Sequence, residues 1–485
     1  MSGRLHFCGI GGVGMSAVAE AALHCGWRVS GSDRRADSRS RSTRVNLPAV
    51  PLRRRGAQSG KTPERQSAEP NGLRPDVSAP DVLELLAECG AEIFPQDGSG
   101  VTDDCAALVV STAIEEDNPD MLAARRQGVA VWHRAECLAH LVGNAKSVAV
   151  TGTSGKSTVT GMLGCIIEAA GLDPAVVNGA PVLNWMDNGN SGSVRRGAMR
   201  LWIFEADESD RSLMSFSPEW AAVTNISTDH FPREEAEALF NKFAAQVKSG
   251  MVWPDETEDA YSLEDGATWS PLLRWQGLAC RLRVPGRHNA ANAVTAARLA
   301  CKMGVAGAAI VDGLEAFRGI ARRLELVGEQ HGVMVVDDYA HNPAKISASL
   351  QAMQALCGGR LRVIWRPHGY GPLRLMLQDL AQVFAATMRP DDRLLLLPVY
   401  DAGGTADRSI NATALAEAIM AQGGQAQVVA DEAEAAGLVL EAAAGDLIMT
   451  MGARDPGLPE LARAILGAMD AGEEDRRLQT ADCRP

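Results

Sequence analysis

The sequence predicts an α/β protein with three domains, each built on a largely parallel, doubly wound sheet. Two glycine-rich loops, Gly9–Gly14 and Gly152–Gly155, each follow a short apolar strand and precede an apolar helix. Elsewhere, short apolar segments alternate with segments of helical periodicity, which is the pattern of strand–helix–strand units in a parallel sheet. At 485 residues the chain is too long for one hydrophobic core, so we expect three domains.

The first glycine loop predicts a nucleotide-binding site in the N-terminal domain, residues 1–142. Residues 4–8 form the expected strand, residues 15–25 the helix, and residues 27–30 a second strand that leads to Asp33. Glycines in a Gly-x-Gly-x-x-Gly loop allow a nucleotide to approach the backbone, and an acidic residue about 20 positions later typically contacts the ribose. The expected ligand contacts are Gly11, Gly12, Gly14 and Asp33.

Residues 34–75 interrupt this domain with a composition that predicts disorder. Arg, Ser, Pro and Gln dominate the segment, and it has no apolar period. Such a segment cannot bury enough apolar surface to offset the entropy lost on ordering. We interpret it as a disordered insertion, after which alternating helices and strands continue to a boundary near Leu141.

The second glycine loop predicts a phosphate-binding site in the central domain, residues 143–321. A loop between a strand and a helix directs backbone N–H groups and a helix N-terminus at one point, which suits a polyphosphate. Lys156 adds a positive charge, and the hydroxyl of Ser157 can ligate Mg²⁺. Val150 stands where the usual phosphate-loop pattern has its first glycine. The expected phosphate contacts are Gly152, Thr153, Ser154, Gly155, Lys156, Ser157 and Thr158.

Two later strands of the central domain end in polar residues. The strand at residues 201–204 leads to Glu205, and the strand at residues 221–224 leads to a polar motif that ends at His230. Open α/β sheets bind ligands at the carboxyl ends of parallel strands, so these side chains are expected near the phosphate loop. We predict a metal–triphosphate site with Ser157, Glu205 and His230 as metal ligands. Ser157 and Glu205 suit Mg²⁺, whereas His230 is expected to act either as a ligand of a second metal or as a hydrogen-bond donor to phosphate. Strand–helix alternation then resumes in a third domain, residues 322–485.

Composition excludes several classes of protein. The formal net charge of −13 argues against non-specific binding to nucleic acid. The ten cysteines are scattered with no Cys-x-x-Cys pair, which favours reduced thiols and a cytoplasmic location. The chain contains no apolar run of about 18 residues, so we expect no membrane span.

Taken in order, these motifs resemble those of the Mur ligase family. The resemblance covers nearly the whole chain outside residues 34–75. The matched segments are Gly9–Ser16, Gly31–Asp33, Ser111–Ile114 with Asn118-Pro119, Arg134–Glu136, Gly152–Thr158, Glu205–Asp210, Thr224–His230, Gly286–Asn292, Arg322–Glu325 and Asp337–Pro343.

The resemblance implies a fold and a reaction. It implies a Rossmann-like N-terminal domain that binds a UDP-sugar, a P-loop-like central ATPase domain, and a Rossmann-like C-terminal domain that binds an amino acid. The implied reaction is ATP-dependent amide formation through an acyl phosphate. It would join an amino acid, expected to be L-alanine, to the carboxylate of UDP-N-acetylmuramate in peptidoglycan precursor synthesis. ATP and Mg²⁺ would be the cofactors and small-molecule substrates the partners, with neither nucleic acid nor membrane involved.

The resemblance also implies roles for individual residues. Lys156, Glu205, His230 and Arg323 would be catalytic. The ATP base and ribose would contact Asn292 and Asp338, beside His288 and Asn289. The substrates would contact Arg134, His341 and His368, together with the first glycine loop.

The third domain departs from the family pattern in the segment Arg366–Arg374. Gly369 and Pro372 stand where alanine-adding members of the family carry arginines, which suit a carboxylate because their planar fork binds it through two hydrogen bonds. Arg374 is a candidate replacement. A ligase for another amine or carboxylate substrate therefore stays open, as does a non-catalytic nucleotide-binding regulatory protein. An NAD-dependent oxidoreductase would leave the phosphate loop without a role.

Overall fold

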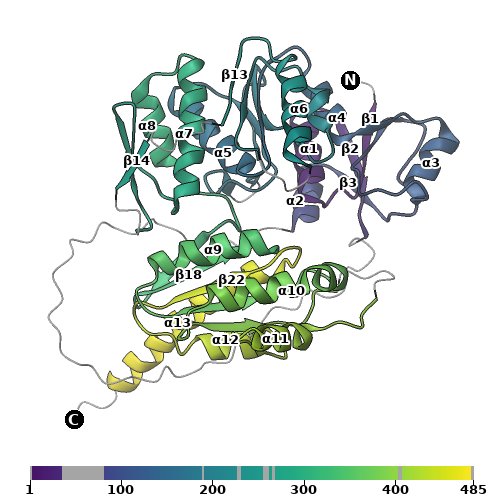
Figure 1. Cartoon of the computed structure of the whole chain (residues 1–485). Helices are drawn as coiled ribbons and strands as arrows, with labels where there is room; N and C mark the ends of the chain where they lie inside the picture. The colour runs from purple at the N-terminus through teal and green to yellow at the C-terminus, as the bar shows by residue number, and fades with distance from the viewer. Residues whose placement is uncertain are drawn as a thin grey trace. The chain divides into compact units, whose positions relative to one another are not determined.

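The computed structural model describes residues 3–34, 81–187, 190–226, 231–254, 261–264, 268–401 and 407–481. These residues form two compact units, one ending at Ala321 and the other beginning at Arg322 (Figure 1). His230, and the predicted insertion apart from Arg34, lie outside the described residues. None of the described helices is long and apolar enough to span a bilayer.

The first unit begins with a five-stranded parallel sheet in the order β3-β2-β1-β4-β5. Its strands are β1 (Arg4–Cys8), β2 (Arg28–Ser32), β3 (Glu92–Phe94), β4 (Cys105–Val110) and β5 (Val131–His133). Its helices are α1 (Val13–His24), α2 (Val82–Glu88), α3 (Pro119–Gln127) and α4 (Arg134–Val142). The predicted strand–loop–helix–strand order of residues 4–33 is confirmed. Local signals set the helix ends: Asn118 caps α3, Pro119 occupies its first turn, and Gly128 ends it in the left-handed conformation.

A second, mostly parallel sheet in the same unit has the order β10-β7-β11-β6-β12-β13. Its strands are β6 (Lys146–Thr151), β7 (Ala175–Val177), β10 (Val194–Arg195), β11 (Leu201–Glu205), β12 (Trp220–Val223) and β13 (Gly250–Val252). Strand β6 is central, and the phosphate loop joins it to α5 (Lys156–Ala169). The sequence had not indicated β7 or β10, because these segments are too short to show a clear period.

Smaller elements complete the first unit. The hairpin β8 (Met186–Asp187) and β9 (Asn190–Ser191) follows β7, and α6 (Arg233–Ala244) follows β12. Strands β14 (Tyr261–Glu264), β15 (Leu272–Trp275) and β16 (Leu278–Arg281) form a separate antiparallel sheet. Helices α7 (Arg287–Lys302) and α8 (Gly307–Ala316) lie beside β14 (Figure 1).

The two large sheets of this unit share a hydrophobic core. Buried residues of α1 and α4 pack in one continuous cluster with the inner residues of β7 and β11, including Trp202 and Phe204. A polar contact crosses the same junction, because Ser191 of β9 donates a hydrogen bond of 2.7 Å to the carboxylate of Glu20 in α1. The Glu20 side chain is thus buried between two sheets, where burial raises its pKa to about 7.

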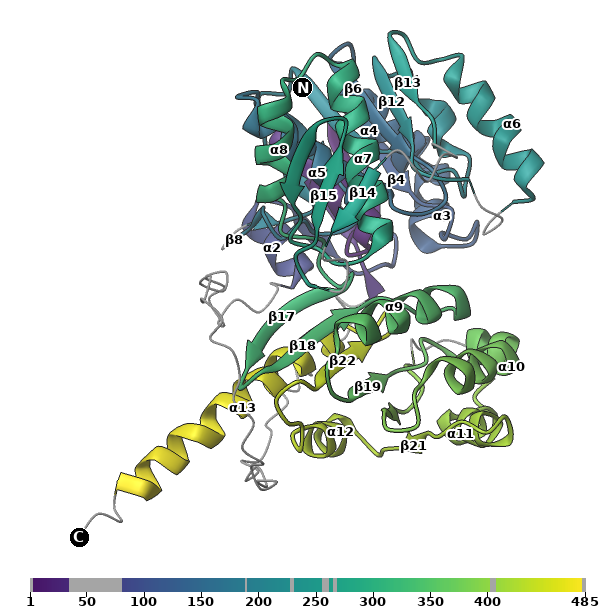
Figure 2. The same cartoon turned by 60° about the vertical axis from the view of Figure 1, so that its left-hand side comes forward.

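The second unit is a doubly wound sheet in the order β17-β18-β22-β19-β20-β21. Its strands are β17 (Glu325–Gln330), β18 (Val333–Asp338), β19 (Leu361–Trp365), β20 (Arg393–Leu396), β21 (Gln427–Val428) and β22 (Leu447–Met451). Its helices are α9 (Pro343–Leu356), α10 (Tyr370–Thr387), α11 (Ala412–Ala421), α12 (Glu432–Val439) and α13 (Gly457–Ala481). Strand β17 is antiparallel to β18 and was not expected from the sequence. Helices α9 and α12 cover opposite faces (Figure 2), and α12 shares a buried cluster with α13.

The buried carboxylate of Glu20 predicts a pH-dependent stability of the first unit. A carboxyl with a pKa of about 7 when folded and 4.5 when unfolded binds more protons in the folded state between these pH values. The free energy of unfolding therefore falls as pH rises through this window, by up to about 3 kcal/mol, and stays lower above it. Urea unfolding from pH 4.5 to 8 should show a steeper fall in the unaltered protein than in Glu20→Gln, in which the buried Asp338 of the second unit, with its pKa raised to about 6, still contributes. Exposed Glu84 on α2 offers the control Glu84→Gln, which should keep the slope. Equal slopes in Glu20→Gln and the unaltered protein would contradict the prediction.

Candidate functional site

The phosphate loop has two glycines in conformations that other residues rarely adopt. Gly152 has φ +123° and Gly155 has φ +82°, and Gly155 is the N-cap of α5. Neighbouring groups also leave no room for a side chain. A Cβ on Gly152 would lie 2.8 Å from the backbone nitrogen of Thr224, and one on Gly155 would lie 2.5 Å from Oδ1 of Asn292. The loop is therefore held tightly by the end of β12 and by α7.

Lys156 is held at the mouth of this loop by acidic residues. Its Nζ donates hydrogen bonds to the carbonyl of Gly152 at 2.9 Å and to Oε2 of Glu208 at 2.8 Å. Oδ1 of Asp207 lies 3.8 Å away. Glu208 is buried, and its Oε1 has no hydrogen-bond partner among the described residues. An uncompensated buried carboxylate oxygen beside the phosphate loop is a feature that a bound cation would satisfy.

Asn225 is a further residue of the site that sequence reasoning did not single out. Its Oδ1 accepts a hydrogen bond of 2.8 Å from the backbone nitrogen of Ser154, and its Nδ2 donates one of 2.6 Å to the Ser154 hydroxyl. Its backbone carbonyl also accepts from the backbone nitrogen of Thr153 at 3.2 Å. Asn225 thus engages two amide groups that the sequence assigns to phosphate. Its place directly after β12 was the available signal, because strand ends collect at this edge of the sheet.

Of the three predicted metal ligands, the structure describes Ser157 and Glu205. Ser157 lies buried in the first turn of α5. Glu205 ends β11, pairs with Val150 of β6, and accepts a hydrogen bond of 2.6 Å from the backbone nitrogen of Gly179. The described residues include no group of three His, Cys, Asp or Glu side chains able to hold a metal by themselves. A hydroxyl, one or two carboxylates, and phosphate or water oxygens nevertheless form the donor set that Mg²⁺ favours.

The residues predicted to surround the ATP base lie at the start of α7. Asn292 reaches the phosphate loop, because its Oδ1 would lie only 2.5 Å from a Cβ placed on Gly155. Asn289 is buried, donates to the carbonyl of Pro285 at 2.7 Å, and accepts from Nδ2 of Asn292 at 3.4 Å. His288 is exposed and lies against the turn at Gly286, whose φ is +94°. The structure therefore brings Asn289 and Asn292 together beside the phosphate loop.

Arg134 connects the two large sheets of the first unit. It is the first residue of α4, and its Nη2 lies 3.0 Å from carboxylate oxygens of both Asp207 and Asp210. Its Nη1 lies 3.3 Å from the position of a Cβ on Gly14, so the first glycine loop packs directly on the guanidinium. Burial by itself would raise the pKa of Asp207, but the positive charges of Lys156 and Arg134 outweigh it and lower the pKa. Asp207 is thus an ionised bridge between Arg134 and Lys156.

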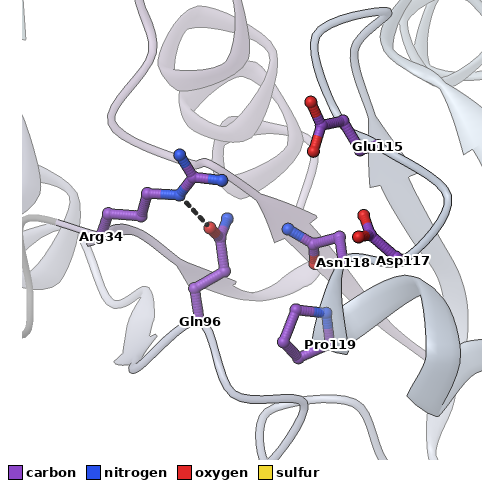
Figure 3. A pocket seen from close by; sticks show the side chains of 6 residues that line it. All are labelled: Arg34, Gln96, Glu115, Asp117, Asn118 and Pro119. Carbon is purple, nitrogen blue, oxygen red and sulfur yellow. Dashed lines mark hydrogen bonds between the residues drawn. The ribbon is translucent and has the colours of Figure 1, made fainter. Parts of the chain in front are cut away.

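Beside the first glycine loop lies a cavity of about 400 Å³ at the carboxyl ends of β2, β3 and β4 (Figure 3). Asp33 accepts a hydrogen bond of 2.9 Å from the backbone nitrogen of Gly11, which fixes the loop next to this cavity. Gly12 caps α1 without a side chain. The cavity is lined by Arg34, Gln96, Glu115, Asp117, Asn118 and Pro119. Sequence reasoning assigned none of these to the site, although each follows a strand end.

The second unit contains the remaining predicted residues. Arg323 is exposed and stands between Arg322 and Leu324, which have φ of +60° and +45°. The rings of His341 and His368 meet edge to face, with centroids 4.9 Å apart. Asp338 is buried, and its carboxylate accepts hydrogen bonds from the backbone nitrogens of Leu324 and Ala340 and from the hydroxyl of Ser349. This gives Asp338 a structural role, and its contact with ribose stays a prediction.

Comparison with known proteins supports the family that the motifs suggest. The model described as "Mur ligase family, catalytic domain" matches residues 4–58 and 76–146, and "Mur ligase, glutamate ligase domain" matches residues 322–454. A UDP-N-acetylmuramate–L-alanine ligase from Sinorhizobium fredii is 32% identical over an alignment covering 93% of this chain and 94% of the relative. The chain belongs to the Mur ligase family. A relative of the same name from Kineococcus radiotolerans is 33% identical, with coverage of 93% and 94%.

Solved structures agree with the Mur ligase fold. The UDP-N-acetylmuramate–alanine ligase MurC of Thermotoga maritima superimposes with a TM-score of 0.73 at 22% identity, over 97% of this chain and 99% of that one. The murein peptide ligase Mpl of Psychrobacter arcticus gives a TM-score of 0.58 at 20% identity, over 96% and 98%. The expected α/β architecture of three parallel-based sheets is confirmed. The first family model leaves residues 59–75 unmatched, inside the segment predicted to be an insertion.

Gly155 offers a test of the phosphate loop, and Gly171, at the other end of the same helix, offers a matched control. Gly155 and Gly171 flank α5 with φ of +82° and +74°, but a Cβ on Gly171 would meet no atom within 4 Å. Alanine at either position should cost roughly 1–2 kcal/mol in backbone strain. Only Gly155→Ala should also displace Asn292, so we expect it to weaken ATP binding at least tenfold, measured by calorimetry. Similar ATP affinity in the two variants would show that the Gly155–Asn292 contact does not shape the site.

Proposed function

We propose that the protein is an ATP-dependent ligase that joins L-alanine to the carboxylate of UDP-N-acetylmuramate in peptidoglycan precursor synthesis. The observation that carries this proposal is identity of 32–33% to ligases of that name over 93% of the chain. The arrangement of Arg134, Asp207 and Lys156 supports it, because an amide ligase of this kind must bring a carboxylate substrate to the γ-phosphate of ATP.

The reaction proceeds through two displacements. The muramoyl carboxylate attacks the γ-phosphate, which releases ADP and forms an acyl phosphate, and the amine of the amino acid then attacks the acyl carbon and expels phosphate. Phosphoryl transfer needs mainly positioning and charge neutralisation. Lys156 supplies a cation at the phosphate loop, and Arg323 is the predicted second cation. Asp207 positions Arg134 and Lys156 relative to each other.

Mg²⁺ fits the residues at the phosphate loop. Ser157 and Glu205 would hold it, as the sequence predicts, and Oε1 of Glu208, which has no hydrogen-bond partner among the described residues, adds a third candidate ligand. The ion would neutralise charge on the triphosphate. His230 stays a predicted ligand.

Each substrate is assigned mainly to one domain, and the exception is Asp338 of the C-terminal domain, which is the predicted ribose contact of ATP. The UDP-sugar would bind at Gly11, Gly12, Gly14, Asp33 and Arg134, with its nucleotide in the adjoining cavity. ATP would contact Asn292, Asn289, His288 and Asp338, and the amino acid would contact His341 and His368. These assignments correspond to domains at residues 1–142, 143–321 and 322–485, in a cytoplasmic enzyme.

The function is tested by ADP release with UDP-N-acetylmuramate, ATP, Mg²⁺ and each of a panel of amino acids, with the products identified by mass. We expect L-alanine to drive release and to appear in an amide product. Release with a different amino acid would reassign the substrate. Nucleotide binding without release under any acceptor would favour a non-catalytic regulatory protein instead.

Lys156→Ala should reduce turnover by at least ~100-fold, because it removes the cation beside the developing phosphoryl charge. The matched control is Lys302→Ala, since Lys302 is exposed at the end of α7. The control should retain full turnover. Substantial turnover in Lys156→Ala, with an unchanged melting temperature, would contradict the proposed role.

A further inference from the structure

Three strand ends converge at one point of the second unit. Asp338 of β18, Met451 of β22 and Trp365 of β19 lie side by side in parallel register. The turns that follow these strands carry His341, Arg454 and His368 respectively. Ligands of open α/β sheets bind at such an edge, and one arginine with two imidazoles at one edge can donate hydrogen bonds to an anion.

Arg454 is the cation of this group that no described residue neutralises. Its neighbours are paired: Arg366 forms ion pairs with Asp455 and Glu432, and Arg322 lies 3.0 Å from Asp337. Arg454 is exposed and makes no hydrogen bond or ion pair with the part of the chain that the structure describes. Its φ of +66° places a non-glycine residue in the left-handed region. Such strain is typical of functional positions.

The surroundings of Arg454 can hydrogen-bond an anion but cannot cancel the arginine's charge. His368 is only 8% exposed and forms no hydrogen bond with the described residues. Burial, together with the positive charges of His341 and Arg454, lowers the pKa of His368 to about 4, so the imidazole is neutral near pH 7. The 18-residue helix α10 begins at Tyr370 with no side-chain cap on its N-terminus, which adds the positive end of a helix dipole.

Gly369, one of the two positions that depart from the family pattern, lies beside the guanidinium of Arg454. A Cβ on Gly369 would lie 3.9 Å from Nη1 of Arg454, so this guanidinium lies within van der Waals contact of the position that an arginine occupies in alanine-adding members of the family. Arg374, the replacement suggested by the sequence, is engaged elsewhere: it forms an ion pair of 2.9 Å with Asp407 and donates to the hydroxyl of Ser409.

We propose that Arg454 binds the α-carboxylate of the amino-acid substrate, with His368 and the N-terminus of α10 lining the same site. This inference rests on the proposed function. The phosphates of ATP are assigned to the loop at Lys156, which leaves the carboxylate of the amino acid as the anion for this edge. A guanidinium is suited to a carboxylate because its parallel N–H groups match the two oxygens.

The test is steady-state ADP release by Arg454→Gly, Arg454→Lys and Arg374→Ala while L-alanine is varied. Arg454→Gly should raise the KM for L-alanine about 10- to 100-fold, the range expected for loss of a charged hydrogen bond, and leave the KM for ATP within about twofold. Glycine also relieves the left-handed strain, so the melting temperature should not fall. Arg454→Lys should retain part of the affinity, and Arg374→Ala should keep the KM of the unaltered enzyme.

An analogue without the carboxylate separates recognition from a structural role. The unaltered enzyme should prefer L-alanine to L-alaninamide, and Arg454→Gly should lose most of that preference. An unchanged KM for L-alanine in Arg454→Gly, an equal rise in the KM for ATP, or a rise confined to Arg374→Ala would each overturn the inference. Absence of ADP release by the unaltered protein with every amino acid would overturn the proposed function itself, and this inference with it.

Discussion

The carboxylate of Asp207 lies between two cations that come from different sheets, and the organisation of the first unit's site depends on this contact. Arg134 approaches it from the N-terminal sheet and Lys156 from the phosphate loop. Partly buried charges are stable only when paired, so the three groups constrain one another. The first glycine loop packs on Arg134 through Gly14, which extends the constraint to the N-terminal glycine loop of the unit.

The register of β11 against β6 determines where Asp207 lies relative to the phosphate loop. Because Glu205 of β11 pairs with Val150 of β6, the acidic segment after β11 emerges beside the phosphate loop after β6. A shift of one residue would turn each side chain of β11 to the opposite face. The buried core on both faces of β6 and β11 opposes such a shift, so packing far from the loop determines where Asp207 and Glu208 lie.

The second unit concentrates backbone strain near its predicted ligand contacts. Arg322, Leu324 and Arg454 all have positive φ although none is glycine. Arg322 is stabilised there by Asp337 and by the carbonyls of Gly452 and Asp455. These hydrogen bonds join the start of the unit to the turn after β22. The guanidinium of Arg322 therefore couples the conformation of Arg454 to that of the Arg322–Leu324 segment.

The sequence by itself determined the α/β class, both glycine loops, most of the parallel strands and the family, because these depend on local periodicity and on motifs of fixed spacing. It did not indicate the short strands β7 and β10, which form by pairing with each other and with β11, or the strand β17, which forms a hairpin with β18. Only the tertiary structure decided that Asn225 engages the phosphate loop, that Asp207 joins Arg134 to Lys156, and that Arg454 reaches Gly369. Each of these contacts joins residues far apart in the chain, and sheet order and register bring them together.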